Sequence, residues 1–261
     1  MAIRIGVIGG GVFGEVHLQT FSQCQRESKC ELVALADVSE ELLAKRKQQY
    51  GVKGYTDYQE MLAREELDGV SVVTPDPMHL PMVLDALNAG CHVLVEKPMD
   101  VTVEGCSKMV AAARKANRLL EVDFHKRFDP YHVALRDAVA AGRIGKPLYA
   151  YACMEDRVEV PLNWWPTWVH KTSPMWFLGA HFIDLFRWVI GRKNGVRVYA
   201  SGAKYKLVSA GIDTYDCVQA KIDFEEDVSL LLDTSWILPN GFAAIVNQQM
   251  RVIGTEGAVE I

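Results

Sequence analysis

Residues 3–17 read Ile-Arg-Ile-Gly-Val-Ile-Gly-Gly-Gly-Val-Phe-Gly-Glu-Val-His, and residues 95–98 read Val-Glu-Lys-Pro. The first stretch is an apolar run that ends in Gly9-x-Gly11-x-x-Gly14, a spacing typical of a strand that turns into a helix around a dinucleotide pyrophosphate. The second stretch places Lys97 at the end of a later apolar run, beside the position expected for the reactive ring of that dinucleotide. A cofactor cradle and a titratable amine together predict a redox enzyme.

The composition fits two domains of ordinary size, since 49% of the 261 residues are hydrophobic and 23% are charged. The net charge of −5 provides no broad basic surface, so we expect neither a nucleic-acid nor a membrane partner. No apolar stretch approaches the roughly 20 residues that span a bilayer, and the first residues enter a strand pattern without a secretory signal. Six cysteines without metal-ligand or disulfide spacing are typical of reduced thiols, which predicts a cytoplasmic protein.

Strand-like and helix-like segments alternate over residues 1–123. Apolar runs predict strands at 3–8, 32–37, 70–74, 91–95 and 119–122. Helices are predicted from 12, from 39, and over 57–65, 78–89 and 102–116, with Ser39 and Thr56 as N-caps of the second and third. This alternation predicts an α/β Rossmann dinucleotide-binding domain, with a parallel sheet covered by helices on both faces.

The pattern changes over residues 124–261. Asp129-Pro130 begins a helix that ends at Gly142, and a second helix is predicted over 177–190. Alternating runs predict strands at 147–154, 195–205, 214–224, 228–236 and 244–254. We expect an α+β domain with a large, mostly antiparallel, open-faced sheet. Because the last residues lie in an apparent hairpin, the C-terminal part of this domain is expected to be incomplete.

Asp37 ends the second predicted strand, 23 positions after Gly14. A carboxylate there accepts hydrogen bonds from the adenosine ribose hydroxyls and repels a 2′-phosphate, so NAD is favoured over NADP. Two alternatives stay open at this point. Asp37 could be a turn or helix-cap residue, and the glycine pattern also suits a methyl-donor nucleotide.

Four motifs together resemble the glucose–fructose oxidoreductase, inositol dehydrogenase and MocA (Gfo/Idh/MocA) family over nearly the whole chain. They are Gly9-x-Gly11-x-x-Gly14-x-x-His17, Thr74-Pro75-Asp76-x-x-His79, Ala89-Gly90-x-His92-Val93-x-x-Glu96-Lys97-Pro98 and Gly179-x-His181-x-x-Asp184. The resemblance implies a nicotinamide-binding domain followed by a domain that carries substrate contacts and subunit interfaces. It also implies a dehydrogenase of sugars, cyclitols or related polyols.

Lys97 and His181 are the predicted catalytic residues. An amine near the positive nicotinamide would have a depressed pKa, so Lys97 could take the hydroxyl proton as a carbonyl forms. By resemblance, His181 relays a proton or binds a substrate hydroxyl, with Asp184 one helical turn later on the same face. Phe177 stands where the family usually has an aspartate, so either Asp184 orients His181 or Lys97 works without that relay. The alternative for His181 is a core or interface histidine.

The predicted cofactor contacts lie in the glycine turn and after later strands. They are Gly9, Gly11, Val12, Phe13, Gly14, Asp37, Thr74, Pro75, His79, Glu96 and Lys97. The alternative for His79 is a ring that only packs at a helix start. We expect His17 to pack in the first helix without a chemical role.

Three residues are predicted to bind substrate: Arg127, Asp184 and Trp168. By resemblance, Arg127 reaches the substrate, where its forked donors could hold vicinal hydroxyls, and the alternative is a solvated basic turn. Trp164, Trp165, Trp168 and Trp176 gather in one segment, where flat rings suit the C–H faces of a sugar or loop packing. The dispersed histidines offer no metal-ligand spacing, so no metal is expected.

The leading hypothesis is an NAD(H)-dependent oxidoreductase that transfers hydride between nicotinamide and a secondary alcohol or carbonyl of a sugar, cyclitol or polyol derivative. One alternative is an NAD-dependent sugar hydrolase with no net redox change. Another is a redox-silent dinucleotide-binding sensor or repressor, which Phe177 keeps open. An open antiparallel sheet usually needs covering, so we expect a homodimer or homotetramer joined through the second-domain sheet.

Overall fold

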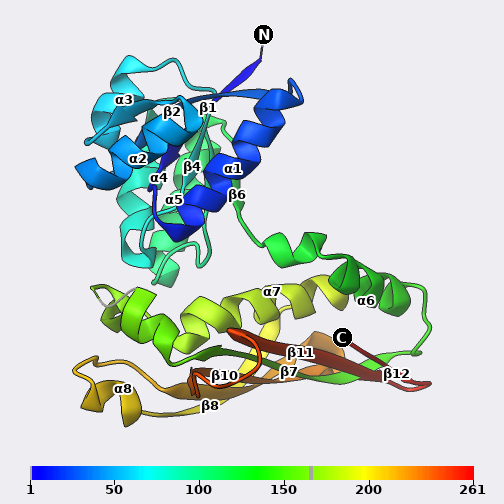
Figure 1. Cartoon of the computed structure of the whole chain (residues 1–261). Coiled ribbons are helices and arrows are strands. Elements are labelled where there is room, and N and C mark those ends of the chain that lie inside the picture. The colour runs from blue at the N-terminus through cyan, green and yellow to red at the C-terminus, as the bar shows by residue number, and fades with distance from the viewer. Residues whose placement is uncertain (1, 165–166) are drawn as a thin grey trace. The chain divides into compact units, whose positions relative to one another are not determined.

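The computed structural model describes residues 2–164 and 167–261. The chain forms two compact units, Met1–Asp123 and Phe124–Ile261, and each unit has its own six-stranded sheet and its own apolar core (Figure 1).

The first unit is built on a parallel sheet in the order β3-β2-β1-β4-β5-β6. Its strands are β1 (Ile3–Ile8), β2 (Cys30–Ala36), β3 (Lys53–Tyr55), β4 (Gly69–Val72), β5 (His92–Val95) and β6 (Leu120–Val122). Its helices are α1 (Val12–Arg26), α2 (Glu40–Tyr50), α3 (Tyr58–Arg64), α4 (His79–Asn88) and α5 (Val103–Ala116). The order and direction of these strands confirm the expected Rossmann domain.

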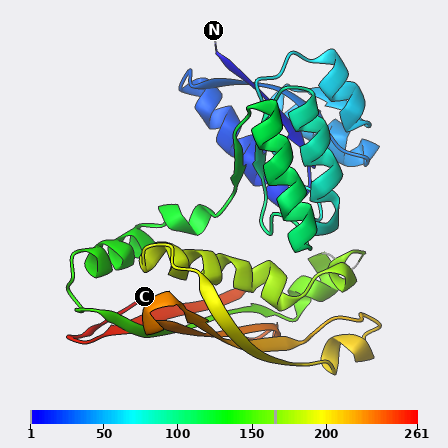
Figure 2. The same ribbon diagram turned by 180° about the vertical axis from the view of Figure 1, so that it is seen from behind.

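Successive residues of these strands contribute to two different cores. Ile8 and Val72 pack with side chains of α4 and α5, whereas Val7 and Val73 pack with side chains of α1 and α2. Figures 1 and 2 show these helices on the two opposite faces of the sheet. Because successive side chains of a strand point to opposite faces, the part of a strand that is buried on both must be apolar throughout, as 6–8 and 32–36 are.

The second unit carries a mixed sheet in the order β12-β11-β7-β10-β9-β8. Its strands are β7 (Pro147–Arg157), β8 (Gly195–Ala203), β9 (Cys217–Phe224), β10 (Ser229–Leu238), β11 (Val246–Gly254) and β12 (Ala258–Glu260). Its helices are α6 (Pro130–Ala140), α7 (Ala180–Val189) and α8 (Lys206–Ser209), and a short 3-10 helix, η2 (His125–Phe128), precedes α6. The fold is the expected α+β domain with a mostly antiparallel sheet: β7 and β10 are parallel, and the other pairs are antiparallel.

One face of this sheet holds the core and the other is open. Leu230 and Leu232 of β10 are fully buried, with α7 packed over their face, whereas Leu231 between them is 46% exposed. Figure 2 shows α6 and α7 lying along one face of the sheet. This alternation is what one covered face requires of an antiparallel sheet.

Several local predictions were wrong in detail. Asp57, not Thr56, caps α3, because its carboxylate accepts the Gln59 backbone N–H at 2.8 Å. Strand β3 was not predicted, because three residues are too few to show the alternation of polar and apolar side chains that marks a strand. The helix predicted from 177 begins as α7 at Ala180, after a turn of π-helix at Met175–Gly179.

Among the residues that the structure describes, no helix is long and apolar enough to cross a membrane.

Candidate active site

The turn after β1 is fixed by two glycines that no other residue can replace without a shift. Gly9 has φ +100°, and a Cβ there would lie 2.3 Å from the carbonyl oxygen of Val73. A Cβ on Gly14 would lie 2.1 Å from the carbonyl oxygen of Gly9. The strand, the turn and α1 can therefore pack this closely only with glycine at both positions.

Gly11 differs from these two, because a Cβ there would meet no atom within 4 Å. Gly11 is the N-cap of α1, and no side chain caps that helix start. The first N–H groups of a helix and its dipole attract an anion, and the open side of Gly11 leaves room for one. The turn that precedes Val12 and Phe13 therefore fits a dinucleotide pyrophosphate.

Asp37 follows β2 and is tied to the glycine turn. Its Oδ2 accepts the Gly10 backbone N–H at 2.7 Å, and its Oδ1 accepts the Ser39 N–H at 2.8 Å. Buried Arg46 of α2 donates from Nε to the Gly10 carbonyl oxygen at 3.2 Å and pairs with Glu15 at 2.6 Å. Sequence reasoning missed Arg46, which lies 36 positions from Gly10, and no local signal distinguishes it from a surface helix residue.

His79 joins the loops that follow β4 and β5. It is fully buried at the start of α4, with Nδ1 2.9 Å from the Pro98 carbonyl oxygen and Nε2 2.9 Å from the Thr74 carbonyl oxygen. A neutral imidazole can donate to one of these oxygens and a charged ring to both. The ring thus does more than pack: it holds the Thr74-Pro75 loop to the Lys97-Pro98 loop. Contact of these loops with a cofactor stays a prediction.

Lys97 lies directly after the carboxyl end of β5 and is 4% exposed. Its Nζ lies 6.0 Å from the centroid of the Phe13 ring, in the first turn of α1. Its backbone N–H donates to Oε2 of the preceding Glu96 at 2.9 Å. The lysine is therefore not a solvated surface residue, and it stands close to the helix that the glycine turn begins.

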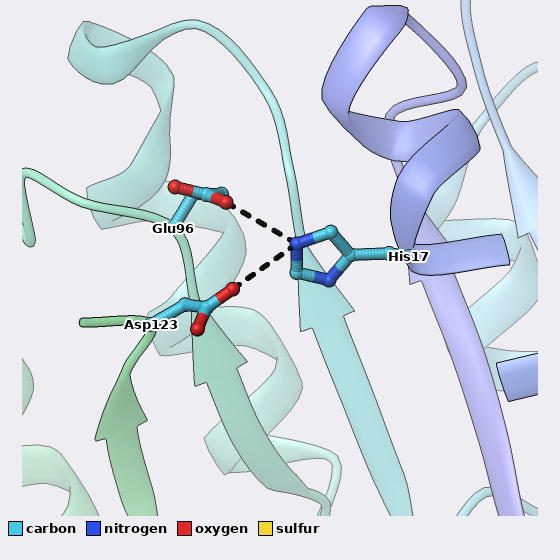
Figure 3. Close-up of side chains that lie close together, drawn as sticks. All are labelled: His17, Glu96 and Asp123. Carbon is cyan, nitrogen blue, oxygen red and sulfur yellow. Dashed lines mark hydrogen bonds and ion pairs between the residues drawn. The ribbon is translucent and has the colours of Figure 1, made fainter. Parts of the chain in front are cut away.

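His17 does not merely pack in α1, because its ring lies between two carboxylates (Figure 3). Its Nε2 is 3.2 Å from Oε1 of Glu96 and 3.3 Å from Oδ2 of Asp123, and its Nδ1 is 2.9 Å from Oγ of Ser71. Burial alone would lower the pKa of His17, but hydrogen bonds and attraction to Asp123 and Glu96 outweigh it and raise the pKa from 6.5 to about 9. The buried ring is therefore an imidazolium at neutral pH.

Histidine, cysteine, aspartate and glutamate side chains can bind metal ions. In the described part of the chain, His17, Glu96 and Asp123 form the one group of three whose potential ligand atoms all lie within 4.8 Å of one another. One nitrogen and two carboxylate oxygens could hold a divalent cation. Sequence reasoning missed this arrangement, because the three residues come from three separate segments. The raised pKa of His17 offers a simpler explanation: the positive charge between the two carboxylates is the protonated imidazole itself, and no metal ion is needed.

In the second unit, η2 is joined to α7 by two contacts. Arg127 donates from Nε to Oδ2 of Asp184 at 2.7 Å and from a terminal nitrogen to Oδ1, a two-pronged ion pair. The His125 ring meets the buried His181 ring edge to face at 5.0 Å between centroids. Asp184 thus has Arg127 as its partner, rather than the His181 ring that the spacing suggested, and His125 is a neighbour that sequence reasoning missed.

Phe177 is a core residue. It is 8% exposed and packs against Trp168 at 6.4 Å and against Trp236 at 6.0 Å between ring centroids. An aromatic ring therefore fills the position where the family resemblance calls for a carboxylate. Trp168 is half-buried against this core, which favours loop packing over sugar stacking, and Trp165 lies outside the described residues.

Comparison with known proteins identifies the class to which this fold and this cradle belong. Residues 3–124 match the model of the oxidoreductase family with an NAD-binding Rossmann fold, and residues 132–260 match the GFO/IDH/MocA C-terminal domain. The chain belongs to the GFO/IDH/MocA family, and it is an NAD-binding oxidoreductase. The family resemblance read from the sequence is thereby confirmed.

Individual relatives support this membership. The chain is 30% identical over 262 residues to the rhizopine catabolism protein MocA of Rhizobium meliloti, covering 98% of this chain and 77% of that protein. It is 32% identical over 212 residues to the inositol 2-dehydrogenase/D-chiro-inositol 3-dehydrogenase of Shouchella clausii, covering 79% of this chain and 59% of that protein. The crystal structure of myo-inositol 2-dehydrogenase from Lactobacillus plantarum has the same fold, with a TM-score of 0.90 at 24% identity, covering 100% of this chain and 76% of that one.

Proposed function

We propose that this protein is an NAD-dependent dehydrogenase that interconverts a secondary alcohol and a carbonyl group of a cyclitol, sugar or related polyol. The observation that carries the proposal is the burial of Lys97 at the carboxyl edge of the parallel sheet, beside Phe13 in the first turn of α1. In open α/β sheets that edge is where ligands bind.

The chemistry that we assign to Lys97 is proton transfer. When bound, the nicotinamide would accept hydride from the carbinol carbon or return it to the carbonyl. The hydroxyl proton must leave as the carbonyl forms, and an amine within reach of that oxygen can take it. In the opposite direction, the ammonium form of Lys97 stabilises the developing alkoxide and returns the proton.

His181 is the residue we propose to assist at the substrate. It is buried on α7, and the His125 ring and the neighbouring Arg127–Asp184 ion pair limit how its helix face can rearrange. A substrate with several hydroxyl groups offers such a histidine both donors and acceptors. The polyol class also agrees with the names of the inositol dehydrogenase relatives.

The direct test is NADH formation from NAD⁺ with a panel of inositols, aldoses and sugar acids, followed by absorbance. We expect turnover with at least one cyclitol or sugar and a preference for NAD⁺ over NADP⁺. Lys97→Met should bind NADH without turning over, whereas Gly11→Val, with a side chain in the open side of the turn, should not bind it. Cleavage of a chromogenic glycoside without net NADH formation would instead support a hydrolase.

Self-association through the open sheet face is a second part of the proposal. The strand registers align Arg251, Tyr151, Leu231, Lys221 and Tyr199 in one row across β11, β7, β10, β9 and β8. This row mixes cations, aromatic rings and an aliphatic side chain, as protein interfaces do. Light scattering should report a dimer or tetramer, and Leu231→Lys should dissociate it without lowering the melting temperature.

A cytoplasmic location belongs to the same proposal. All six cysteines are free thiols, and three of them are buried. Thiols that persist unpaired suit a reducing compartment.

A further inference from the structure

We propose that His17 is a positioning residue for Lys97: held between the carboxylates of Glu96 and Asp123, it fixes the Glu96 side chain, whose other oxygen holds the backbone N–H of Lys97. This inference rests on the proposed function of Lys97 as the proton-transfer group. It assigns a role to a residue of α1 that lies beyond the glycine turn.

The contacts form a chain from helix to lysine. His17 Nε2 lies 3.2 Å from Oε1 of Glu96, and Oε2 of the same carboxylate accepts the Lys97 N–H at 2.9 Å. The two oxygens of Glu96 therefore have separate tasks, one toward α1 and one toward the lysine backbone. Since a carboxylate is rigid and planar, fixing one oxygen fixes the direction of the other.

Asp123 and Ser71 contact the ring from two further strands, Asp123 through a carboxylate on the same side as Glu96 and Ser71 through a neutral hydroxyl on the other. Asp123 follows β6 with its Oδ2 3.3 Å from Nε2, and Ser71 in β4 meets Nδ1 at 2.9 Å. Figure 3 shows the imidazole of α1 directed at the two carboxylates that end the neighbouring strands. The ring thus links α1 to the ends of β5 and β6, and a shift of any of them would disturb Glu96.

Charge decides that the ring is needed. The Glu96 and Asp123 side chains are 7% and 22% exposed, so two carboxylates would repel each other there without a cation. The polar groups in contact with the ring are Ser71 from β4, Glu96 from the end of β5 and Asp123 from the end of β6, and Phe21 of α1 is its aromatic neighbour. The raised pKa of His17 agrees with a cation held by this pair.

The test compares His17→Gln with Ser71→Ala. Glutamine keeps a donor but carries no charge, whereas Ser71→Ala removes the Nδ1 partner and leaves both carboxylates in place. We expect His17→Gln to lower kcat by about 10- to 100-fold, because a displaced catalytic group costs on this order, with KM for NAD⁺ changed less than about threefold. Ser71→Ala should stay within about threefold of wild type in both constants.

A readout that needs no turnover separates this inference from the proposed function. Hydrogen exchange of the Lys97 amide should be at least about tenfold faster in His17→Gln than in wild type, and unchanged in Ser71→Ala. Asp123→Asn is a milder change that can be used if His17→Gln fails to fold. It should make the Lys97 amide exchange faster than in wild type, by less than the roughly tenfold expected for His17→Gln. If the wild-type protein shows no turnover, the proposed dehydrogenase activity is wrong. The exchange data would still show whether His17 holds Glu96 and the Lys97 backbone in place.

Three outcomes would overturn the inference. They are wild-type kcat in His17→Gln, an unchanged Lys97 amide in both His17→Gln and Asp123→Asn, and faster exchange of that amide in Ser71→Ala as large as in His17→Gln. The inference would also be wrong if the wild-type protein bound one equivalent of zinc or another divalent metal that a chelator removes and that His17→Gln lacks. The cluster would then be a metal site.

Discussion

Each unit buries a histidine on a helix, and the two rings are held in opposite ways. His17 in the first unit and His132 in the second are 7% and 3% exposed. Two carboxylates within hydrogen-bonding distance raise the pKa of His17 to about 9. His132 lies edge-on to Phe182, with Asp129 only at 3.8 Å, and burial lowers its pKa. Burial alone therefore does not decide whether a histidine is charged, because the number and distance of the carboxylates do.

The same contrast separates the two candidate catalytic residues. Lys97 is held through its backbone by a buried charged cluster at the ends of parallel strands. His181 is held through side chains, by a ring contact and a neighbouring ion pair between η2 and α7. The first arrangement leaves less freedom, and we therefore expect the chemistry to depend more steeply on the first unit.

The largest expected effect distinguishes these two residues. Lys97→Met should lower kcat by about 10³-fold, because it removes the general acid–base group. His181→Gln should lower kcat by about 10- to 100-fold, because glutamine keeps part of the hydrogen bonding. Steady-state kinetics with the substrate found in the panel, at constant NAD⁺ saturation, measures both, and a larger loss in His181→Gln would reverse the proposed roles.

The second effect is the pH dependence of the first unit. The folded pKa of His17 lies above its unfolded value, so its contribution is fully present below pH 6.5 and is lost as the pH rises through about 9. The shift corresponds to about 3 kcal/mol of unfolding free energy. Urea titrations at pH 6 and pH 10 should show this difference, and His17→Gln should abolish most of it.

Signals from the two units can be separated in such experiments. All six tryptophans lie in the second unit, so their fluorescence reports that unit alone. Circular dichroism or hydrogen exchange is needed to follow the first. A pH effect of this size in tryptophan fluorescence, with none in the first unit, would contradict the assignment to His17.

A third effect concerns the ion pair of the second unit. Arg127→Lys cannot keep the two-pronged contact with Asp184, so it should cost about 1–3 kcal/mol of second-unit stability. Tryptophan fluorescence during urea unfolding measures this loss. Arg197→Lys is the control, since that arginine is exposed, pairs with Asp223 at the surface and should change stability by less than about 0.5 kcal/mol. Equal effects would mean that the Arg127 pair is a surface contact only.

The smallest effect has the opposite sign to that of His17. Because burial lowers the pKa of His132, its contribution is present at neutral pH and is lost as the pH falls below 6.5. The second unit should therefore weaken on the acidic side, and His132→Gln should flatten that slope. Stability that instead rises on acidification in wild type would show that Asp129 dominates the ring.

Local sequence patterns predicted the glycine turn, the parallel strands other than β3 and both histidine-bearing helices, because each depends on neighbouring residues. The contacts between distant segments were not predictable in this way: Asp123 is far from His17 in the chain, and Arg127 is 57 positions from Asp184. One signal was available. Glu96 and Asp123 directly follow the neighbouring parallel strands β5 and β6, and such positions meet at the same edge of a sheet. Threonine and aspartate both cap helices, so the residue types alone do not decide whether Thr56 or Asp57 is the N-cap of α3.

The position of β7 has a consequence for how the chain is made. It is the first strand of its sheet to leave the ribosome, yet it lies between β10 and β11, which are both synthesised much later. Until residue 229 and beyond emerge, both edges of β7 lack their final partners. Unpaired edges attract other chains, so this unit should be the slower to fold and the one most dependent on chaperones during synthesis.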